Sequence, residues 1–252
     1  MRFRYVPVEQ LTLPMYEQMY ALMSRYYDGV SFERFLTDLW EKTEVILLVG
    51  KNNKIEGFTT ILLFDRWVGD RKISGIFSGD TVLNKDYWGN RALTVAFGLY
   101  LTKLVFSAPF RSHYWFLMSK GYKTYLLMTN NTIVYYPRFE SDTPTFYQAL
   151  IDRFYGERYG KAYDPATGLI SPMENRSHLK HQVADIEPRH LSNPKIRFFA
   201  ECNPNWIDGV ELPCVSVINI RTVLFFTTTL ALRQVRALAS RGWKRIWRPA
   251  RA

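Results

Sequence analysis

The chain of 252 residues is poor in the residues that cross-link small proteins or bind structural metals. Its two cysteines, Cys202 and Cys214, are too few for a disulfide framework or a credible zinc site. We interpret the close histidine pair, His178 and His181, as a solvated surface feature, and we expect no metal site. Residues 1–14 contain no apolar run like that of a signal peptide, so a cytoplasmic protein is expected.

The sequence also lacks internal repeats and low-complexity tracts. With 47% hydrophobic and 22% charged residues it is typical of a globular protein, long enough to bury a substantial core. Phenylalanine and tyrosine are abundant and bring the aromatic content to 16%. This abundance predicts either a thick aromatic core or an aromatic-lined pocket for an apolar ligand, and the composition leaves both open.

Acidic residues are absent from the C-terminal segment, residues 221–252. Its eight basic residues account for most of the net charge of +10, so the remaining 220 residues are nearly neutral. Residues 222–232 form an uncharged run of 11, too short to span a bilayer core, which takes about 20 residues. The basic residues that follow are mixed with apolar ones, among them Trp243 and Trp247. The sequence therefore predicts a basic amphipathic tail.

Three interpretations of this tail remain open. In the first, residues 223–232 pack on the body as a final helix or strand, with a solvated basic end. Alternatively, the tail lies on an anionic membrane surface, which makes the protein peripheral at the inner face of the membrane. In the third interpretation, the positive charge attracts an acidic carrier protein.

Hydrophobic periodicity and capping residues indicate where helices and strands form. Pro14 suits the first turn of a helix within residues 11–27, and Ser31 is a good N-cap for a helix over residues 32–42. Strands are expected at residues 43–51, 54–67, 73–83 and 112–119, helices at 92–106 and 143–160, and two late strands at 194–204 and 212–220. Residues 120–131 fit either a short helix or a further strand.

The elements are therefore expected in the order strand, two helices, three strands, loop, helix, strand, helix. This order predicts a mixed α/β fold, with a largely antiparallel central sheet flanked by helices and a C-terminal extension. We divide the chain into a core of residues 1–138, an extension of residues 139–220 that completes the sheet or covers a pocket, and the tail of residues 221–252.

The loop between the third strand of this meander and the long helix is basic and contains one glycine. A helix N-terminus presents unpaired N–H groups and a partial positive charge, which together favour an anion. Gly89 lets the backbone approach a ligand closely, and Lys85 and Arg91 add positive charge. The loop is either a phosphate site or a plain strand-to-helix turn in which Gly89 serves only its dihedral angles.

The order of elements over residues 1–138, together with this loop, resembles the GNAT acyltransferase superfamily. The resemblance implies that the loop holds the pyrophosphate of acyl-CoA or the phosphopantetheine of an acyl carrier protein as co-substrate, through Lys85, Trp88, Gly89, Asn90, Arg91 and Ala92. Gly89 matches the usual loop of the family, whereas Trp88 stands where Arg or Gln is usual and Arg91 where a second glycine is usual. The chain resembles in particular the branch that uses acyl carrier proteins, such as N-acyl amino acid synthases.

The resemblance also implies a reaction and its residues. In the family, the splayed fourth and fifth strands admit the pantetheine arm, and an N–H group of the fourth strand, here in residues 81–83, polarises the thioester carbonyl. Asp80 is then the candidate base and Tyr122 the candidate acid, with Tyr125, His113 and Glu56 as substitutes. For Asp80 a strand-end hydrogen bond, and for the tyrosines a place in the core, are the competing interpretations.

Tyr26, Tyr27 and Asp28, between the first two helices, are expected to meet a small amine acceptor. The predicted function is therefore an N-acyltransferase that uses a pantetheine thioester. The alternative is a non-catalytic module that binds an acylated carrier or an anionic membrane surface. Nucleic acid is not expected as a partner, because the body is nearly neutral and carries no recognised motif.

Overall fold

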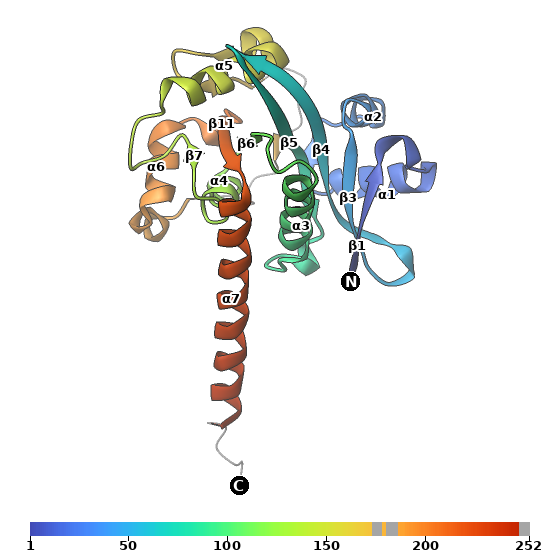
Figure 1. Cartoon of the computed structure of the whole chain (residues 1–252). Coiled ribbons are helices and arrows are strands. Elements are labelled where there is room, and N and C mark those ends of the chain that lie inside the picture. The colour runs from blue at the N-terminus through green and yellow to red at the C-terminus, as the bar shows by residue number, and fades with distance from the viewer. Residues whose placement is uncertain (173–177, 180–185, 247–252) are drawn as a thin grey trace.

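The structure is a computed structural model that describes residues 1–172, 178–179 and 186–246. Within these residues a seven-stranded sheet forms the centre of the molecule, in the order β1-β3-β4-β5-β6-β11-β7 (Figure 1). Its strands are β1 (Arg2–Pro7), β3 (Glu44–Val49), β4 (Ile55–Val68), β5 (Arg71–Leu83), β6 (His113–Ser119), β7 (Tyr135–Tyr136) and β11 (Leu212–Ile218). Neighbouring strands are antiparallel except β5 and β6, which are parallel. The predicted fold class, a mixed and largely antiparallel sheet flanked by helices, is confirmed.

Short elements complete the described part of the chain. Two two-stranded ladders pair β2 (Tyr27–Asp28) with β10 (His178–Leu179), and β8 (Tyr163–Asp164) with β9 (Leu169–Ile170). Single 3-10 turns are found at Val8–Gln10, Lys51–Asn53, Lys85–Tyr87, Gly160–Ala162, Pro188–Ser192 and Trp206–Asp208. His181, one half of the histidine pair, lies outside the described residues.

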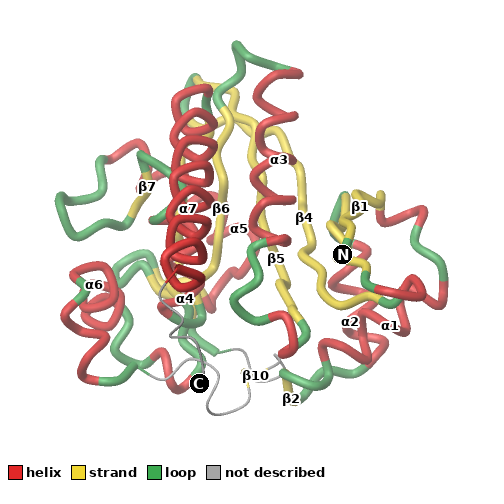
Figure 2. The backbone as a smooth tube through the Cα atoms, turned by 90° about the horizontal axis from the view of Figure 1, so that it is seen from below, coloured by secondary structure: helices red, strands yellow, loops and turns green. Residues whose placement is uncertain are grey.

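Helices cover both faces of the sheet. On one face, α1 (Leu13–Met23) and α2 (Phe32–Trp40) pack on β3 and β4, and α5 (Thr145–Tyr159) packs on β6 and β11. On the other face lie α3 (Ala92–Ser107), α4 (Tyr122–Thr129), α6 (Pro194–Cys202) and the first turns of α7 (Ile220–Ile246). Figure 2 shows α1 and α2 beside β1 at one edge and α6 at the opposite side. Alternate strand residues supply the two cores, as the two-residue period of a strand requires.

The helix starts follow the predicted capping chemistry. Pro14 lies in the first turn of α1, and Ser31 Oγ accepts a hydrogen bond from Arg34 N at 3.2 Å at the start of α2. The helix predicted at residues 92–106 forms as α3, and its apolar stripe is buried, with Leu104 half-buried at the edge. The predicted helices and the strands of the meander are thereby confirmed.

One predicted strand is wrong, because residues 194–202 form helix α6. Asn193 Oδ1 accepts a hydrogen bond from Lys195 N, and Pro194 occupies the first turn, so the helix has both an N-cap and a favourable start. Ile196 and Phe199 are buried at a helical spacing of three. The second late strand is confirmed as β11, and residues 122–129, for which two structures were open, form α4.

The final helix α7 follows β11 directly and extends away from the body (Figure 1). Thr222, Val223 and Phe226 are buried against the body, whereas Leu224 and Phe225 on the next positions are exposed. Among the described residues no helix is both long and apolar enough to cross a membrane. The last residues of the basic tail, 247–252, lie outside the described residues.

Gly98 of α3 is where α7 presses most closely on the core. A Cβ atom at Gly98 would lie 2.2 Å from ring carbons of Phe226, so the two helices meet at a residue without a side chain. Gly98→Ala should therefore lower the free energy of unfolding by about 1 kcal/mol, because overpacking, at about 1–3 kcal/mol, outweighs the gain in helix propensity. Denaturation in urea measures the change.

Gly156→Ala in α5 is the matched control. The nearest side-chain atom to a Cβ atom there is 3.9 Å away, so this variant should gain about 0.5–1 kcal/mol from helix propensity alone. Gly98→Ala should cost less in a Phe226→Leu background, because the smaller side chain relieves the clash. If Gly98→Ala stabilises as much as Gly156→Ala, the close contact between α3 and α7 is refuted.

Candidate active site

The strands β5 and β6 separate partway along their length. Their parallel pairing runs from Ser74↔His113 to Ser78↔Leu117 and then ends. Beyond that point β5 stays paired with β4 as far as Leu83, and β6 stays paired with β11 as far as Ser119. Each strand thus follows its outer neighbour, and the sheet opens between them. This is the splayed opening that the resemblance to GNAT acyltransferases implies.

A β-bulge lies at the start of the opening. Gly79 and Asp80 of β5 together oppose a single residue of β4, Thr60. A Cβ atom at Gly79 would lie 2.5 Å from Thr60 Oγ1 and 3.0 Å from Lys42 Cε, so this position has no room for a side chain. Bulges redirect the side chains beside them, and Asp80 lines the cavity that fills the opening.

The cavity has a volume of about 190 Å³ and passes from one face of the sheet to the other. Helices α1, α2 and α5 line it on one face and α4 on the other, with β5 and β6 between them. Its lining is rich in charge. The charged members are Arg34, Asp38, Lys42, Asp80, Lys120, Arg158 and Glu211.

A buried lysine stands beside Asp80. Lys42 is 8% exposed, and its Nζ donates a hydrogen bond to the Asp38 carbonyl oxygen at 2.6 Å. Burial lowers the pKa of Lys42, while the charge of Asp80 acts in the opposite direction. Arg158 of α5, paired with Glu41 at 2.6 Å, adds a second cation to the same side of the cavity. Asp80 therefore faces positive charge on this side.

On the other side of the cavity, Tyr27 and Glu211 come together. Glu211 is 5% exposed, and its Oε1 lies 3.4 Å from Lys120 Nζ. Its Oε2 is buried and has no hydrogen-bond partner in the described part of the chain. The pKa of Tyr27 is raised, first by burial and then by the charges of Asp80 and Glu211. The Tyr27 hydroxyl is thus close enough to both carboxylates to interact with their charges.

Backbone N–H groups of β5 also face the opening. Asn84 N donates to the Glu56 carbonyl oxygen of β4 at 2.8 Å, and Val82 lies opposite Phe58 of β4. Because residues of an antiparallel strand alternate between facing a neighbour and facing away, the N–H groups of Thr81 and Leu83 point away from β4. These two N–H groups lie within residues 81–83, where the family resemblance implies the donor to the thioester carbonyl.

The loop from Lys85 to Ala92 is held firmly to the end of β5. Trp88 Nε1 donates a hydrogen bond to the Leu83 carbonyl oxygen at 2.9 Å. Tyr26 accepts a hydrogen bond from Lys85 N at 2.6 Å, and the ring centroids of Tyr26 and Trp88 are 5.8 Å apart. Gly89 has φ +83°, a conformation that favours glycine. Tyr26, predicted to meet the acceptor, therefore supports this loop and does not line the cavity.

The loop ends at the N-terminus of α3, where anion-binding groups gather. Asn90 Oδ1 accepts a hydrogen bond from Ala92 N at 2.8 Å, and the N–H groups that follow have no partner within the helix. Lys85, Gly89 and Arg91 are exposed around this end. Exposed cations, unpaired N–H groups and a partial positive charge are a donor set that fits a phosphate group.

The candidate acids Tyr122 and Tyr125 belong to α4, and both side chains are buried in the hydrophobic core. Neither residue lines the cavity. Tyr122 packs on His190, with ring centroids 5.4 Å apart, and Tyr125 donates a hydrogen bond to the Pro137 carbonyl oxygen at 2.9 Å. Thr124 of the same helix lines the cavity. Asp28, predicted to bind the acceptor, lies in β2 and is exposed, also outside the cavity lining.

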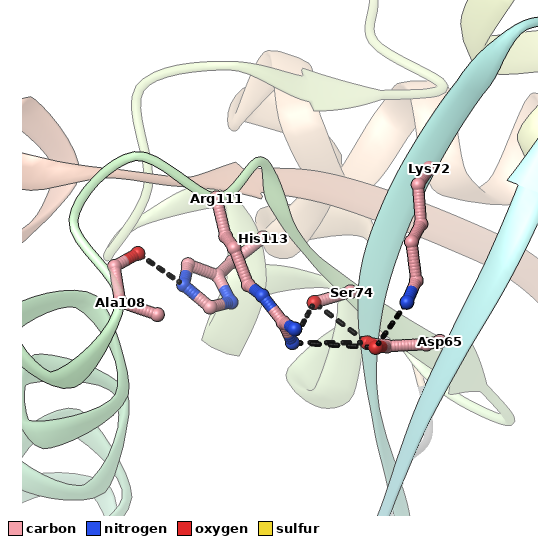
Figure 3. A network of polar contacts seen from close by, with 6 residues as sticks. All are labelled: Asp65, Lys72, Ser74, Ala108, Arg111 and His113. Atoms are coloured by element: carbon pink, nitrogen blue, oxygen red, sulfur yellow. Dashed lines mark hydrogen bonds and ion pairs between the residues drawn. The ribbon is translucent and has the colours of Figure 1, made fainter.

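His113, a substitute base, lies at the paired end of β5 and β6, away from the opening. It begins β6, about 13 Å along the strand from Leu117 at the usual rise per residue. Its Nε2 lies 3.2 Å from the Ala108 carbonyl oxygen. Figure 3 shows this contact with Ala108, apart from the separate network in which Ser74, Lys72 and Arg111 contact Asp65. His113 belongs to the closed end of the β5–β6 ladder.

Several cavity residues could not be identified from the sequence. Lys42 follows the end of an ordinary amphipathic helix, Arg158 lies on a helix beyond residues 1–138, and Glu211 precedes a late strand. The one sequence signal for Glu211 is an acidic residue directly before a buried apolar strand. No group of three or more His, Cys, Asp or Glu residues that could hold a metal ion occurs among the described residues.

Comparisons with known proteins give similarity in structure alone. No protein-family model matches the sequence, and no curated protein matches it. The GNAT-family N-acetyltransferase YhbS from Escherichia coli, solved in complex with CoA, has a TM-score of 0.36 at 13% identity over 47% of this chain and 62% of that one. An aminoglycoside acetyltransferase from an uncultured soil metagenomic sample, in complex with sisomicin, has a TM-score of 0.36 at 14% identity, over 51% and 84%.

A third neighbour is a conserved protein of unknown function from Enterococcus faecalis, described as a probable N-acyltransferase. It has a TM-score of 0.42 at 11% identity, over 54% of this chain and 33% of that one. The structural neighbours of the chain therefore include GNAT-family N-acetyltransferases at low sequence identity.

Glu56, the other substitute for the base, holds the start of the loop before α3 through its contact with Asn84. It is 6% exposed, and its Oε2 accepts a hydrogen bond from Asn84 Nδ2 at 2.6 Å. Burial by itself raises the pKa of Glu56, but hydrogen bonds from Asn84 and Lys54 outweigh it, so the pKa is lowered. Glu56→Gln should therefore cost about 1–2 kcal/mol of unfolding free energy at pH 7 by weakening these bonds.

The cost should depend on pH. A lowered carboxyl pKa stabilises the folded state above the unfolded pKa of about 4.3, and this stabilisation is lost as the pH falls through the folded value. The difference between wild type and Glu56→Gln, measured by denaturation in urea, should shrink from pH 7 to pH 3. Glu17→Gln, an exposed site on α1, should show no such difference, and a constant difference for Glu56→Gln would contradict the assignment.

Proposed function

We propose that the protein is an N-acyltransferase that moves an acyl group from a pantetheine thioester to an amine. The observation that supports this best is the cavity between β5 and β6, which brings the Asp80 carboxylate and the free N–H edge of β5 together. The basic loop before α3 stands at the end of the same strand. These are a base, a carbonyl-polarising donor and a phosphate site, as acyl transfer from a thioester requires.

The proposed reaction uses few groups. Asp80 takes one proton from the acceptor ammonium, and the resulting amine attacks the thioester carbon. The C–N bond forms while the Thr81 N–H stabilises the carbonyl oxygen, and the C–S bond then breaks. The nitrogen loses its second proton to the departing sulfur, which leaves as a thiol. Because Tyr122, the acid implied by the family resemblance, lies outside the cavity lining, this scheme transfers that proton without it.

The donor is acyl-CoA or an acylated carrier protein. Both carry a phosphate on the pantetheine arm, so Lys85, Arg91 and the N-terminus of α3 suit either one. We also propose that residues 139–220 are an extension of the core of residues 1–138 that completes the sheet or covers the acyl pocket. Support comes from Arg158, Tyr159 and Glu211, which line the cavity from this extension.

Arg91→Glu tests the phosphate site. It places a negative charge beside the donor phosphate, and the loss of one charged contact costs about 1.5–3 kcal/mol, so KM for the donor should rise about tenfold to hundredfold. KM for the amine should stay unchanged. The assay follows thiol release from a series of acyl-CoA and acyl carrier protein donors with a mixture of amines.

Lys103→Glu is the matched control, because it makes the same charge change at an exposed site on the same helix, three turns from the loop. It should leave donor kinetics unchanged. If Arg91→Glu and wild type have the same KM for the donor, the loop is a plain strand-to-helix turn and not a phosphate site. Absence of thiol release with every donor and amine would refute the acyltransferase.

The tail supports a second role, peripheral binding to an anionic surface. Leu224, Phe225 and Leu232 on α7 are exposed, although they belong to the apolar run of the tail. Arg233 begins the basic series. An exposed apolar stripe beside basic residues is the composition of a helix that lies in a membrane interface, and each basic residue near such a surface adds about 1 kcal/mol.

Vesicle flotation tests this role. The full chain should float with vesicles that contain phosphatidylserine at low salt and be released at high salt, because the attraction is screened. A chain without residues 233–252 should remain at the bottom. If the full chain ignores these vesicles but binds an acidic acyl carrier protein, the basic tail serves the donor; if it binds neither, it is a solvated end.

A further inference from the structure

The oxygen Oε2 of Glu211 is a buried, unpartnered acceptor in a residue that lines the cavity. Glu211 is 95% buried, and its Oε2 lacks a hydrogen-bond partner among the described residues. A buried charged oxygen without a donor carries a large desolvation cost, so such oxygens are usually paired. Because Glu211 lines the cavity, a donor on a bound molecule can reach this residue from the cavity side.

A second carboxylate, that of Asp80, lines the same cavity as Glu211. Tyr27 lines this cavity as well, and after burial the charges of the two acids raise the pKa of its hydroxyl. Lys42 accompanies Asp80, and Lys120 lies 3.4 Å from Glu211 Oε1. Asp80 and Glu211 therefore each have one lysine neighbour. In the described part of the chain, Glu211 Oε2 still lacks a hydrogen-bond donor.

We propose that Glu211 and Asp80 together bind the primary ammonium group of the acyl acceptor, with Glu211 Oε2 accepting one of its hydrogen bonds. An ammonium group carries three donors and a full positive charge, and so satisfies two carboxylates at once. An alcohol of the same size brings one donor and no charge. The acceptor class is thus a cationic primary amine.

The two acids have different parts in this site. Asp80 lies on β5 beside the Thr81 N–H and takes the proton that the ammonium loses. Glu211 takes no proton in this scheme and holds the nitrogen by a hydrogen bond, so it is a positioning residue. The role of the cation as acyl acceptor rests on the proposed function, whereas its binding between the two acids does not.

A binding measurement with a simple probe tests the site. Wild type should bind n-butylammonium at least tenfold more tightly than n-butanol in a ligand-observed NMR titration. Glu211→Gln should lose at least tenfold in affinity for n-butylammonium, because the isosteric amide removes the charge. Glu201→Gln, at an exposed position on α6, should bind like wild type.

Thermal unfolding of each variant shows whether it is folded. If Glu211→Gln unfolds, Asp80→Asn decides, since it should also lose affinity for n-butylammonium. Unchanged affinity for n-butylammonium in the folded variant, or equal affinity of wild type for n-butanol, would overturn the proposal.

Kinetics separate this proposal from the proposed function. In an active enzyme, Glu211→Gln should raise KM for the amine with the donor KM unchanged, and Asp80→Asn should lower kcat. If n-butylammonium binds through Glu211 and no donor releases thiol, the acyltransferase is refuted and the ammonium site stands. If thiol is released and Glu211→Gln leaves the amine KM unchanged, the ammonium site is refuted and the acyltransferase stands.

Discussion

The end of the β5–β6 ladder is the constraint on which the rest of the site depends. Five residue pairs hold these two parallel strands together, after which each strand stays with its antiparallel neighbour. The bulge at Gly79 and Asp80 adds a residue to β5 where the strands part, and bulges sharpen local twist. Backbone N–H groups that would pair inside a closed sheet are left facing a cavity. The opening is therefore built into the sheet and needs no separate binding domain.

The loop before α3 and the cavity between β5 and β6 differ in the charges that they present. The loop before α3 exposes cations around a helix end, whereas the cavity holds carboxylates among its cations. Outside the basic tail the chain is nearly neutral, so these local differences are not overwhelmed by a strong overall field. The exposed cations of the loop carry the proposed phosphate site, and two carboxylates of the cavity, Asp80 and Glu211, carry the proposed ammonium site.

The sequence predicted elements well where a local rule decides them. Ser31 and Pro14 mark helix starts through their own backbone chemistry, and the meander from β3 to β5 follows from apolar runs separated by turns. The strand predicted at residues 194–204 was wrong. The apolar and aromatic residues of this segment also suit a strand, but burial of Ile196 and Phe199 against α4 favours a helix. In that segment tertiary packing outweighed intrinsic preference.

The candidate site was only partly predictable, for a related reason. Asp80 and Gly89 belong to a continuous strand–loop–helix unit, so their neighbourhood can be inferred from local order. Lys42 and Glu211 reach the same cavity from opposite ends of the chain, and no periodicity records that they meet. Tyr122 illustrates the converse, because it is close to β6 in sequence but packs on His190 in the core. Predicting such groups needs the sheet order itself.

The insertion of β11 beside β6 has a consequence for how the chain is made. β6 ends at Ser119, and its outer neighbour begins at Leu212, roughly ninety residues later. Until β11 has been synthesised, the apolar strand β6 therefore has an unpaired edge. Such an edge favours aggregation or chaperone binding. Glu211 arrives together with the strand that covers this edge. An unfinished chain thus lacks both a closed sheet and the carboxylate to which we assign the ammonium group.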